Sequence, residues 1–210
     1  MIIIGERLNS SRKLVQEALA RRDDCFLLEE GKLQEKAGAT YIDLNASALA
    51  ERQKEVLSWA IPVLQGSLKV PLALDTPNPE AMEEGLKIHR GRALLNSLTG
   101  EQRRIRSLLP LIKDFQPRVI VLCLDDKGVP ERPERTLALA QMMVELVVGQ
   151  GVRAEDIFID PLVRPVATNW KAGVIFLHSL EKIKRRLPEI KTVAGVSNVS
   201  YGLPQRKFLN

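Results

Sequence analysis

Short apolar runs alternate with amphipathic stretches along almost the whole chain, and this alternation limits the folds open to it. The runs are apolar on both faces, as in parallel strands that are buried on both sides. They lie at 2–4, 41–44, 71–74, 93–95, 119–124, 157–159 and 193–196. Stretches with helical spacing lie between them, as at 14–19, 57–64, 108–115 and 137–146. Strand and helix in turn, about seven times over, predict a parallel α/β fold.

Two architectures fit this pattern, a doubly wound sheet and a (β/α) barrel. A doubly wound sheet usually carries a glycine-rich phosphate turn after its first strand. Here the first turn reads Gly5-Glu6-Arg7-Leu8-Asn9, which lacks that motif. A barrel instead places ligand-binding residues at the carboxyl ends of many strands.

A carboxylate or an amide follows every predicted strand. These residues are Glu6 and Asn9, Asp43 and Asn45, Asp75, Asn96, Asp125 and Asp126, Asp160, and Asn198, which follows Ser197. Any one of them can simply begin a loop or cap a helix. We interpret Asp125-Asp126-Lys127-Gly128 as a turn, and Asn45 and Asn78 as possible helix caps. In a barrel all the strand ends meet at one mouth, so the complete set favours the barrel.

The residue types at these ends limit the chemistry. The two histidines, His89 and His178, lie in or beside helical stretches, and neither a catalytic triad nor a histidine-rich metal cluster is visible. Carboxylates and amides suit a neutral heterocycle that is rich in N–H donors. A pterin has a ring N–H beside an exocyclic amine and matches one carboxylate bidentately. We therefore expect a pterin-like ligand and no bound metal.

The composition is that of one globular domain, predicted to span residues 1–210. Of the residues, 45% are hydrophobic and 27% are charged, and no apolar stretch is long enough to span a membrane. The start of the chain is predicted to be a strand and not a signal peptide. Cys25 and Cys123 form neither a metal-ligand spacing nor a disulfide framework, which favours a reducing cytoplasm. With 4% aromatics there is no stacking platform for nucleic acid.

Several strand-end segments resemble those of the pterin-binding methyltransferases. The resemblance is greatest to methyltetrahydrofolate:corrinoid/iron–sulfur protein methyltransferase and its relatives, which include the folate domain of cobalamin-dependent methionine synthase. The segments are Ile-Gly-Glu-Arg-Leu-Asn (4–9), Asp-Leu-Asn (43–45), Leu-Asp-Thr-Pro-Asn (74–78), Leu-Asn-Ser (95–97), Ile-Asp-Pro-Leu (159–162) and Gly-Val-Ser-Asn-Val-Ser (195–200). They occur in the family's order along the whole chain.

The resemblance implies a TIM-type (β/α)8 barrel and a set of roles. Asp75, Asn96 and Asp160 would hold the pterin ring, with Asp160 at the pyrimidine edge. Asn198 would lie near N5, where it strengthens its hydrogen bond as the transition state forms. The substrate-binding set is completed by Asp43, Asn45, Glu6, Asn9, Ser197 and Arg206.

The implied reaction transfers the methyl group of methyltetrahydrofolate to cobalt(I). The corrinoid would be carried by a separate protein, such as a corrinoid/iron–sulfur protein, because this chain has no Asp-x-His-x-x-Gly segment. Dihydropteroate synthase is the alternative enzyme. It usually has a Ser-Arg-Lys-type segment late in the barrel, whereas here Asn198 stands where that arginine is expected and Arg206 follows a Gly-Leu-Pro turn.

The eighth strand and the last helix of the family barrel are not found before Asn210. A fragment is the preferred explanation, and a natural truncation completed by a partner, or an inactive relative, stays open. The last possibility keeps a third function in view, a catalytically silent folate-binding subunit. The family usually forms homodimers, but the sequence identifies neither the dimer surface nor the pathway and corrinoid protein served.

Overall fold

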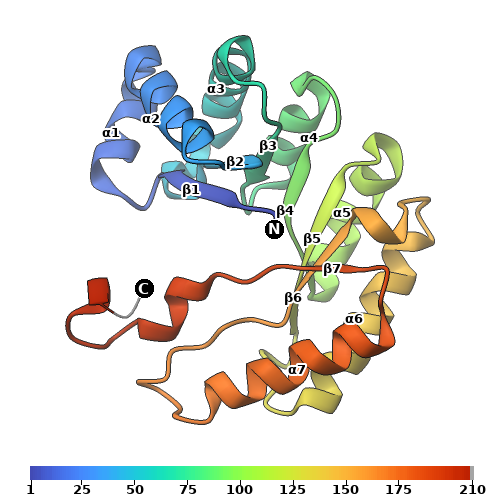
Figure 1. The fold of residues 1–210 in the computed structure, drawn as a ribbon. Helices are drawn as coiled ribbons and strands as arrows, with labels where there is room; N and C mark the ends of the chain where they lie inside the picture. Colours follow the sequence, from blue (N-terminus) through green and yellow to red (C-terminus); the bar gives the residue numbers. More distant parts are fainter. Residues whose placement is uncertain (209–210) are drawn as a thin grey trace. The chain divides into compact units, whose positions relative to one another are not determined.

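The computed structural model describes residues 1–208, in which strands alternate with helices (Figure 1). The chain forms two compact units. The first unit contains Met1–Ser97 and Asp114–Arg118. The second contains Leu98–Lys113 and the chain from Val119 onward.

The first unit is a parallel sheet with helices between its strands. Its elements are β1 (Ile4–Asn9), α1 (Lys13–Arg21), α2 (Asp24–Lys36), β2 (Tyr41–Asn45), the 3₁₀ helix η1 (Ser47–Arg52), α3 (Gln53–Ser67), β3 (Leu72–Asp75), α4 (Pro79–Ile88) and the start of β4 (Leu94–Gly100). Each strand pairs in parallel with the next one in the sequence. In Figure 1 helices α2, α3 and α4 lie along one face of this sheet. Every residue of β2 is buried, as the doubly apolar pattern predicts.

Side-chain caps set the starts of two of these helices. The Oδ1 atom of Asn78 accepts hydrogen bonds from the backbone N–H groups of Glu80 (2.9 Å) and Ala81 (3.1 Å), and Pro79 is the first helical residue. The cap predicted at Asn78 is therefore confirmed. Asp23 caps α2 in the same way, yet no helix was predicted there. The buried face of α2 includes Gly31 and a glutamine, so it lacks an apolar stripe.

A glycine allows α4 to pack closely on β3. A Cβ atom at Gly85 would lie 3.0 Å from Cδ1 of Leu74 and 3.4 Å from Cδ1 of Ile61. A larger side chain would push α4 away from β3, which carries Leu74, and from α3, which carries Ile61, because packed interiors leave little room. Asp75 follows Leu74 directly, so this contact also fixes the strand end that carries it.

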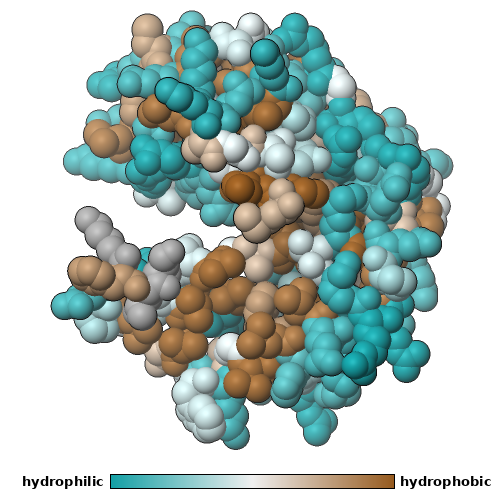
Figure 2. Space-filling view, viewed as in Figure 1, coloured by the Kyte–Doolittle hydropathy of each residue, from teal (hydrophilic) through white to brown (hydrophobic). Residues whose placement is uncertain are grey.

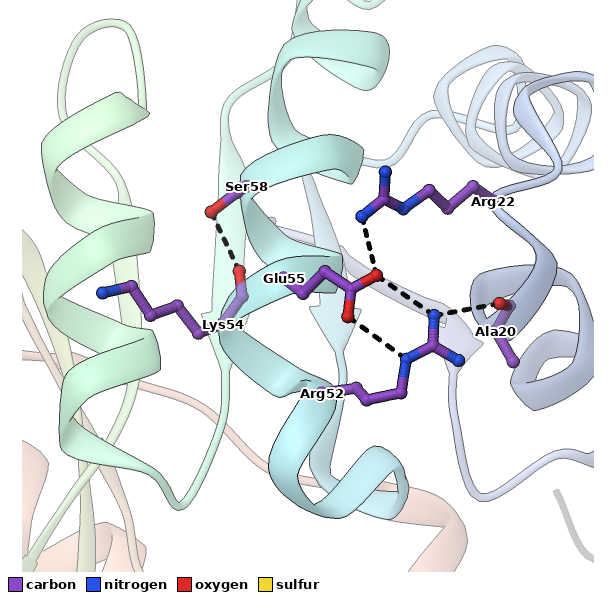
Figure 3. A network of polar contacts seen from close by, with 6 residues as sticks. All are labelled: Ala20, Arg22, Arg52, Lys54, Glu55 and Ser58. Atoms are coloured by element: carbon purple, nitrogen blue, oxygen red, sulfur yellow. Dashed lines mark hydrogen bonds and ion pairs between the residues drawn. The ribbon is translucent and has the colours of Figure 1, made fainter.

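An exposed ion-pair network links α1, η1 and α3 (Figure 3). Glu55 accepts hydrogen bonds from Arg22 (2.6 Å) and Arg52 (3.2 Å), and Arg52 also donates to the carbonyl of Ala20 (3.1 Å). Exposed pairs of this kind contribute little to stability, because solvent and salt screen the charges. The network therefore orients the surface segment η1 more than it stabilises the unit.

The second unit repeats the strand and helix pattern. Its elements are α5 (Gln102–Phe115), β5 (Arg118–Asp125), α6 (Pro133–Val148), η2 (Ala154–Asp156), β6 (Ile157–Asp160), α7 (Ala172–Arg186), β7 (Lys191–Thr192), η3 (Val196–Ser200) and η4 (Arg206–Phe208). Strand β6 pairs in parallel with both β5 and β7. Figure 2 shows apolar atoms gathered over α7, where Val174 and Leu177 are exposed. Helix α7 thus carries apolar residues on its exposed side as well as on its buried side.

The predicted position of the seventh strand, 193–196, is wrong. The strand β7 is Lys191–Thr192, and Val193 adds only one further hydrogen bond, from its N–H to the carbonyl of Ile159 (3.0 Å). The backbone then turns, because Asn198 N–H bonds to the carbonyl of Gly195 (3.1 Å). The N–H of Tyr201 likewise bonds to the carbonyl of Asn198 (3.1 Å), so from Val196 onward the chain forms η3 and does not continue the sheet. Two other predicted ends are shifted, because β1 continues past Glu6 to Asn9 and β4 continues past Asn96 to Gly100.

Strand order distinguishes the two architectures. Within each unit parallel strands follow the order of the sequence, with a helix between each strand and the next. A doubly wound sheet reverses its strand order at a switch point, and a (β/α) barrel does not. The predicted α/β fold of TIM type is therefore confirmed, with seven strands among the described residues. No helix within residues 1–208 is both long enough and apolar enough to cross a membrane.

Candidate substrate-binding site

Four of the predicted residues form one row across the sheet of the first unit. Asn9 on β1 is in register with Asn45 on β2, Asn45 with Asp75 on β3, and Asp75 with Asn96 on β4. Parallel pairing in register brings the same level of each strand to one height. The row therefore places three amides and a carboxylate side by side, as expected if the strand ends form one binding surface.

Asn45 is held by hydrogen bonds on both sides of its amide. Its Nδ2 donates to Oδ2 of Asp75, and its Oδ1 accepts from the N–H (3.0 Å) and the hydroxyl (2.6 Å) of Ser47 and from the hydroxyl of Ser10 (3.2 Å). These partners fix which way the amide points. Asn45 thus works both as a turn residue and as a group that positions the Asp75 carboxylate.

Asp43 is almost completely buried beside this row, with 2% of its surface exposed. It lies two residues before Asn45, so the two side chains leave the same face of β2. Nδ2 of Asn96 donates to its Oδ1 (2.9 Å). Burial raises the pKa of the Asp43 carboxyl well above its usual value, and the charge of Asp75 raises it further. The Asn96 hydrogen bond opposes this rise.

Glu6 and Asn9, on β1, lie at the edge of the same group. Glu6 is exposed, although partial desolvation raises the pKa of its carboxyl. Its charge adds a small further rise to the pKa of Asp43. The Oδ1 atom of Asn9 accepts the N–H of Ser11 (2.9 Å), which makes it part of the turn after β1. The first unit therefore brings together Glu6, Asn9, Asp43, Asn45, Asp75 and Asn96.

Asp160 ends β6 in the second unit, as predicted. Its Oδ1 accepts the N–H of Leu162 (2.8 Å), whose φ of 67° is left-handed. The carboxylate therefore shapes the loop that follows it. Burial, with a smaller effect of the Asp160 charge, raises the pKa of the Cys123 thiol to about 12. Cys123 is consequently an unreactive core residue.

Asn198 lies in η3 and is exposed. Its side-chain amide forms no hydrogen bond with any residue the structure describes. The amide lies directly over Gly195, where an added Cβ atom would be 2.9 Å from Nδ2. The side chain is thus available to a ligand, and the glycine gives it room.

Arg206 holds η3 from the following segment. Its Nη2 donates to the carbonyl of Ser197 (2.9 Å), its Nε donates to the hydroxyl of Ser200 (3.1 Å), and its guanidinium lies over the ring of Tyr201. Ser197 takes part through its backbone, and its side chain is exposed. Arg206 thus supports the backbone of η3. Binding of substrate by Arg206 or by Ser197 stays a prediction.

The remaining candidates have structural or surface positions, as predicted. Asp125 accepts the N–H of Lys127 (2.9 Å) and pairs with Arg135, in a turn closed by the N–H of Gly128. His89 is buried, and its Nε2 accepts the N–H of Leu72 (3.2 Å). Burial lowers the pKa of His89, which keeps the ring neutral as a core residue. His178 is exposed on α7.

Two residues of interest were missed by sequence reasoning. Gly195 was seen only as part of a segment, because its contact with Asn198 depends on the turn of η3. Arg164 was overlooked although it is a lone cation in the apolar, proline-rich stretch Pro161-Leu162-Val163-Arg164-Pro165, which is a detectable signal. Within residues 1–208 no group of three or more His, Cys, Asp or Glu side chains is arranged to hold a metal ion.

Comparisons with known proteins agree with this geometry. A methylcorrinoid:tetrahydrofolate methyltransferase of Eubacterium limosum is 34% identical over 100% of this chain and 78% of its own length. A methionine synthase of Mycobacterium tuberculosis is 26% identical over the whole chain, which spans only 19% of that protein. A dihydropteroate synthase structure from Yersinia pestis, solved with a pterine-sulfa conjugate, has a TM-score of 0.69 at 18% identity, covering 98% of this chain and 77% of that one. This likeness shows the fold alone. The family model described as pterin binding enzyme matches residues 5–208, and the chain therefore belongs to the pterin-binding enzyme family.

Proposed function

We propose that the protein transfers the N5-methyl group of methyltetrahydrofolate to the cobalt(I) of a corrinoid carried by a separate protein. The observation that carries this proposal is the 34% identity, over the whole chain, to a relative named for methyl transfer between a corrinoid and tetrahydrofolate. A corrinoid/iron–sulfur protein is one such partner.

The strand-end residues support binding of the pterin. Its ring N–H and exocyclic amine match the two oxygens of a carboxylate, a role that we give to Asp160. Asp75 and Asn96 bind other ring positions. The Oδ1 of Asn96 accepts no hydrogen bond from any described residue, so it can accept one from a ring N–H. Asn45, with its amide already committed on both sides, positions Asp75.

The chemistry needs help at N5, because a tertiary amine is a poor leaving group. The two electrons of the N5–methyl bond stay on nitrogen, which takes a proton from solvent, while cobalt(I) supplies the electron pair of the new bond and becomes methylcobalt(III). We assign to Asn198 a hydrogen bond at N5 that strengthens as this charge shift develops. A neutral amide does this without titrating, and an exposed, unbonded side chain can move as the reaction requires.

The same site carries the methyl group in either direction, by microscopic reversibility. The name of the Eubacterium limosum relative is written from methylcorrinoid to tetrahydrofolate. The methyl donor supplied to the enzyme, and not the site residues, sets the net direction.

An anaerobic assay with methyltetrahydrofolate and free cob(I)alamin tests the proposal. We expect the cobalt(I) spectrum to be replaced by that of methylcobalamin. Asn198→Ala should lower turnover by about 10²-fold or more while changing the Kd of methyltetrahydrofolate little. Gln141→Ala, which removes an exposed amide of α6, is the control. Folate binding without methyl transfer to any corrinoid would indicate a silent folate-binding subunit, and formation of dihydropteroate from the pterin pyrophosphate would indicate the synthase.

A further inference from the structure

Arg164 lies in the loop that follows β6, four residues after Asp160. This loop is fixed against the segment that carries Asn198. The N–H of Val166 donates to the carbonyl of Val199 (3.1 Å), and a Cβ atom at Gly202 would lie 3.4 Å from Cβ of Ala167. The loops after β6 and β7 therefore support each other. Arg164 therefore belongs to the same local structure as Asp160 and Asn198, two of the proposed site residues.

The guanidinium of Arg164 is poorly paired for its degree of burial. Only 24% of its side chain is exposed, and its Nη2 atom is buried without a hydrogen-bond partner among the described residues. Its nearest acid is Glu131, whose Oε1 is 4.0 Å from Nη1 and whose side chain is 80% exposed. That separation is too long for a hydrogen bond, and such an exposed pair contributes little.

Three other arginines of the second unit have close hydrogen-bond or ion-pair partners for their guanidinium groups. Arg135 binds Asp125 at 2.9 Å, Arg153 binds Asp156 at 2.9 Å, and Arg206 donates to two oxygens of η3. A buried N–H without a partner costs a free energy comparable to a lost hydrogen bond. Arg164 would recover this cost by turning a planar pair of N–H groups toward an anion with two oxygens.

We propose that Arg164 binds a carboxylate of the glutamate tail of the folate. This inference rests on the proposed function and extends its site beyond the pterin ring. The carboxylates and amides at the strand ends suit the ring, and none of them carries a positive charge to pair with an anion. The tail carboxylates are the only anionic groups of methyltetrahydrofolate, and Arg164 is a cation without a close acidic partner, on the loop that begins at Asp160.

Titration calorimetry with two ligands tests this role. The ligands are 5-methyltetrahydrofolate and 5-methyltetrahydropteroamide, which lacks the glutamate and ends in a neutral amide. We expect the wild-type protein to bind the folate about 10-fold more tightly, the value of one charge-assisted contact. Arg164→Gln should abolish this preference and leave the Kd of the pteroamide within about 2-fold of the wild-type value. Arg164→Lys should retain part of the preference, because the charge stays and the planar fork is lost.

Arg185→Gln is the matched control, since Arg185 is 78% exposed on α7 and pairs with Glu181. Equal binding of both ligands by the wild-type protein, or a preference that survives in Arg164→Gln, would overturn the inference. The wild-type comparison decides this even if a variant does not fold. If the wild type binds neither ligand, the proposed function fails as well. If Arg164→Gln keeps the folate preference and instead raises the KM for the corrinoid, the anion is the corrinoid phosphate and the folate assignment is wrong.

Discussion

Gly195→Ala displaces the proposed catalytic amide without disturbing the fold. The added Cβ atom would lie 2.9 Å from Nδ2 and 3.7 Å from Cγ of Asn198. Ordinary contact between such atoms begins at about 3.5 Å, so the amide must shift by at least about 0.6 Å. The glycine has φ −78° and ψ 78°, which alanine can adopt. Since the clash is with the end of an exposed side chain, we expect the free energy of unfolding to change by less than about 1 kcal/mol.

The functional effect of this shift should be much larger than its effect on stability. Displacing a reacting group by about 1 Å can cost about 10²-fold in rate. We expect Gly195→Ala to lower the rate of methyl transfer by about 10- to 100-fold. The Kd of methyltetrahydrofolate should stay within about 3-fold, because the ring contacts assigned to Asp75, Asn96 and Asp160 are unchanged. Single-turnover kinetics with cob(I)alamin measure the first quantity and titration calorimetry the second.

A double-mutant cycle shows whether the glycine acts through the amide. In the Asn198→Ala background, Gly195→Ala should cause almost no further loss, because no amide remains to be displaced. Gly173→Ala is the control, since a Cβ atom at that position of α7 meets nothing within 4 Å. Wild-type turnover in Gly195→Ala, or equal losses in the two backgrounds, would refute the argument.

Two further predictions concern the first unit. Asn78→Ala removes the cap of α4 and should lower the free energy of unfolding by about 1 kcal/mol, measured by urea denaturation, whereas the neighbouring exposed change Glu80→Ala should cost less. Because burial raises the folded-state pKa of Asp43 above its unfolded value of about 3.9, folding binds a proton between those two values, and stability falls as the pH rises through that window. Asp43→Asn removes the pH dependence that this carboxyl group gives to stability. The urea midpoint of the variant minus that of the wild type should therefore increase from pH 4 to pH 8. If the two midpoints differ by the same amount at both pH values, the pKa of Asp43 is not raised.

The regular part of the fold was predictable because local patterns determine it. β2 is buried on both faces, and its run of apolar residues predicts that directly. Asn78 with Pro79 is a capping pattern within three residues, so the start of α4 was also predictable. The row from Asn9 to Asn96 followed from the rule that parallel strands present their carboxyl ends together.

The parts that could not be predicted depend on contacts between distant residues. The segment at Val193–Val196 has the composition of a strand, but only the N–H of Val193 bonds to the neighbouring strand, and the chain enters η3 at Val196. Arg206 is close in sequence to the predicted site, yet its guanidinium is used to hold η3 through Ser197 and Ser200. No local pattern shows that an arginine is already satisfied by its own fold.

Hydrogen-bonding capacity divides the predicted residues into two groups with different roles. Asn45 has bonds to Asp75, Ser10 and Ser47, and an amide engaged on both sides is suited to positioning a neighbour. Asn198 forms no side-chain hydrogen bond within residues 1–208. In the sequence both asparagines are simply amides at strand ends. Truncation to alanine should nevertheless have different effects, on stability for Asn45 and on turnover for Asn198. Loss of the Asn45 amide removes its hydrogen bonds to Asp75, Ser10 and Ser47 and so lowers stability. Loss of the Asn198 amide leaves no described partner unsatisfied, so a cost in turnover without a cost in stability would identify it as the residue that contacts the substrate.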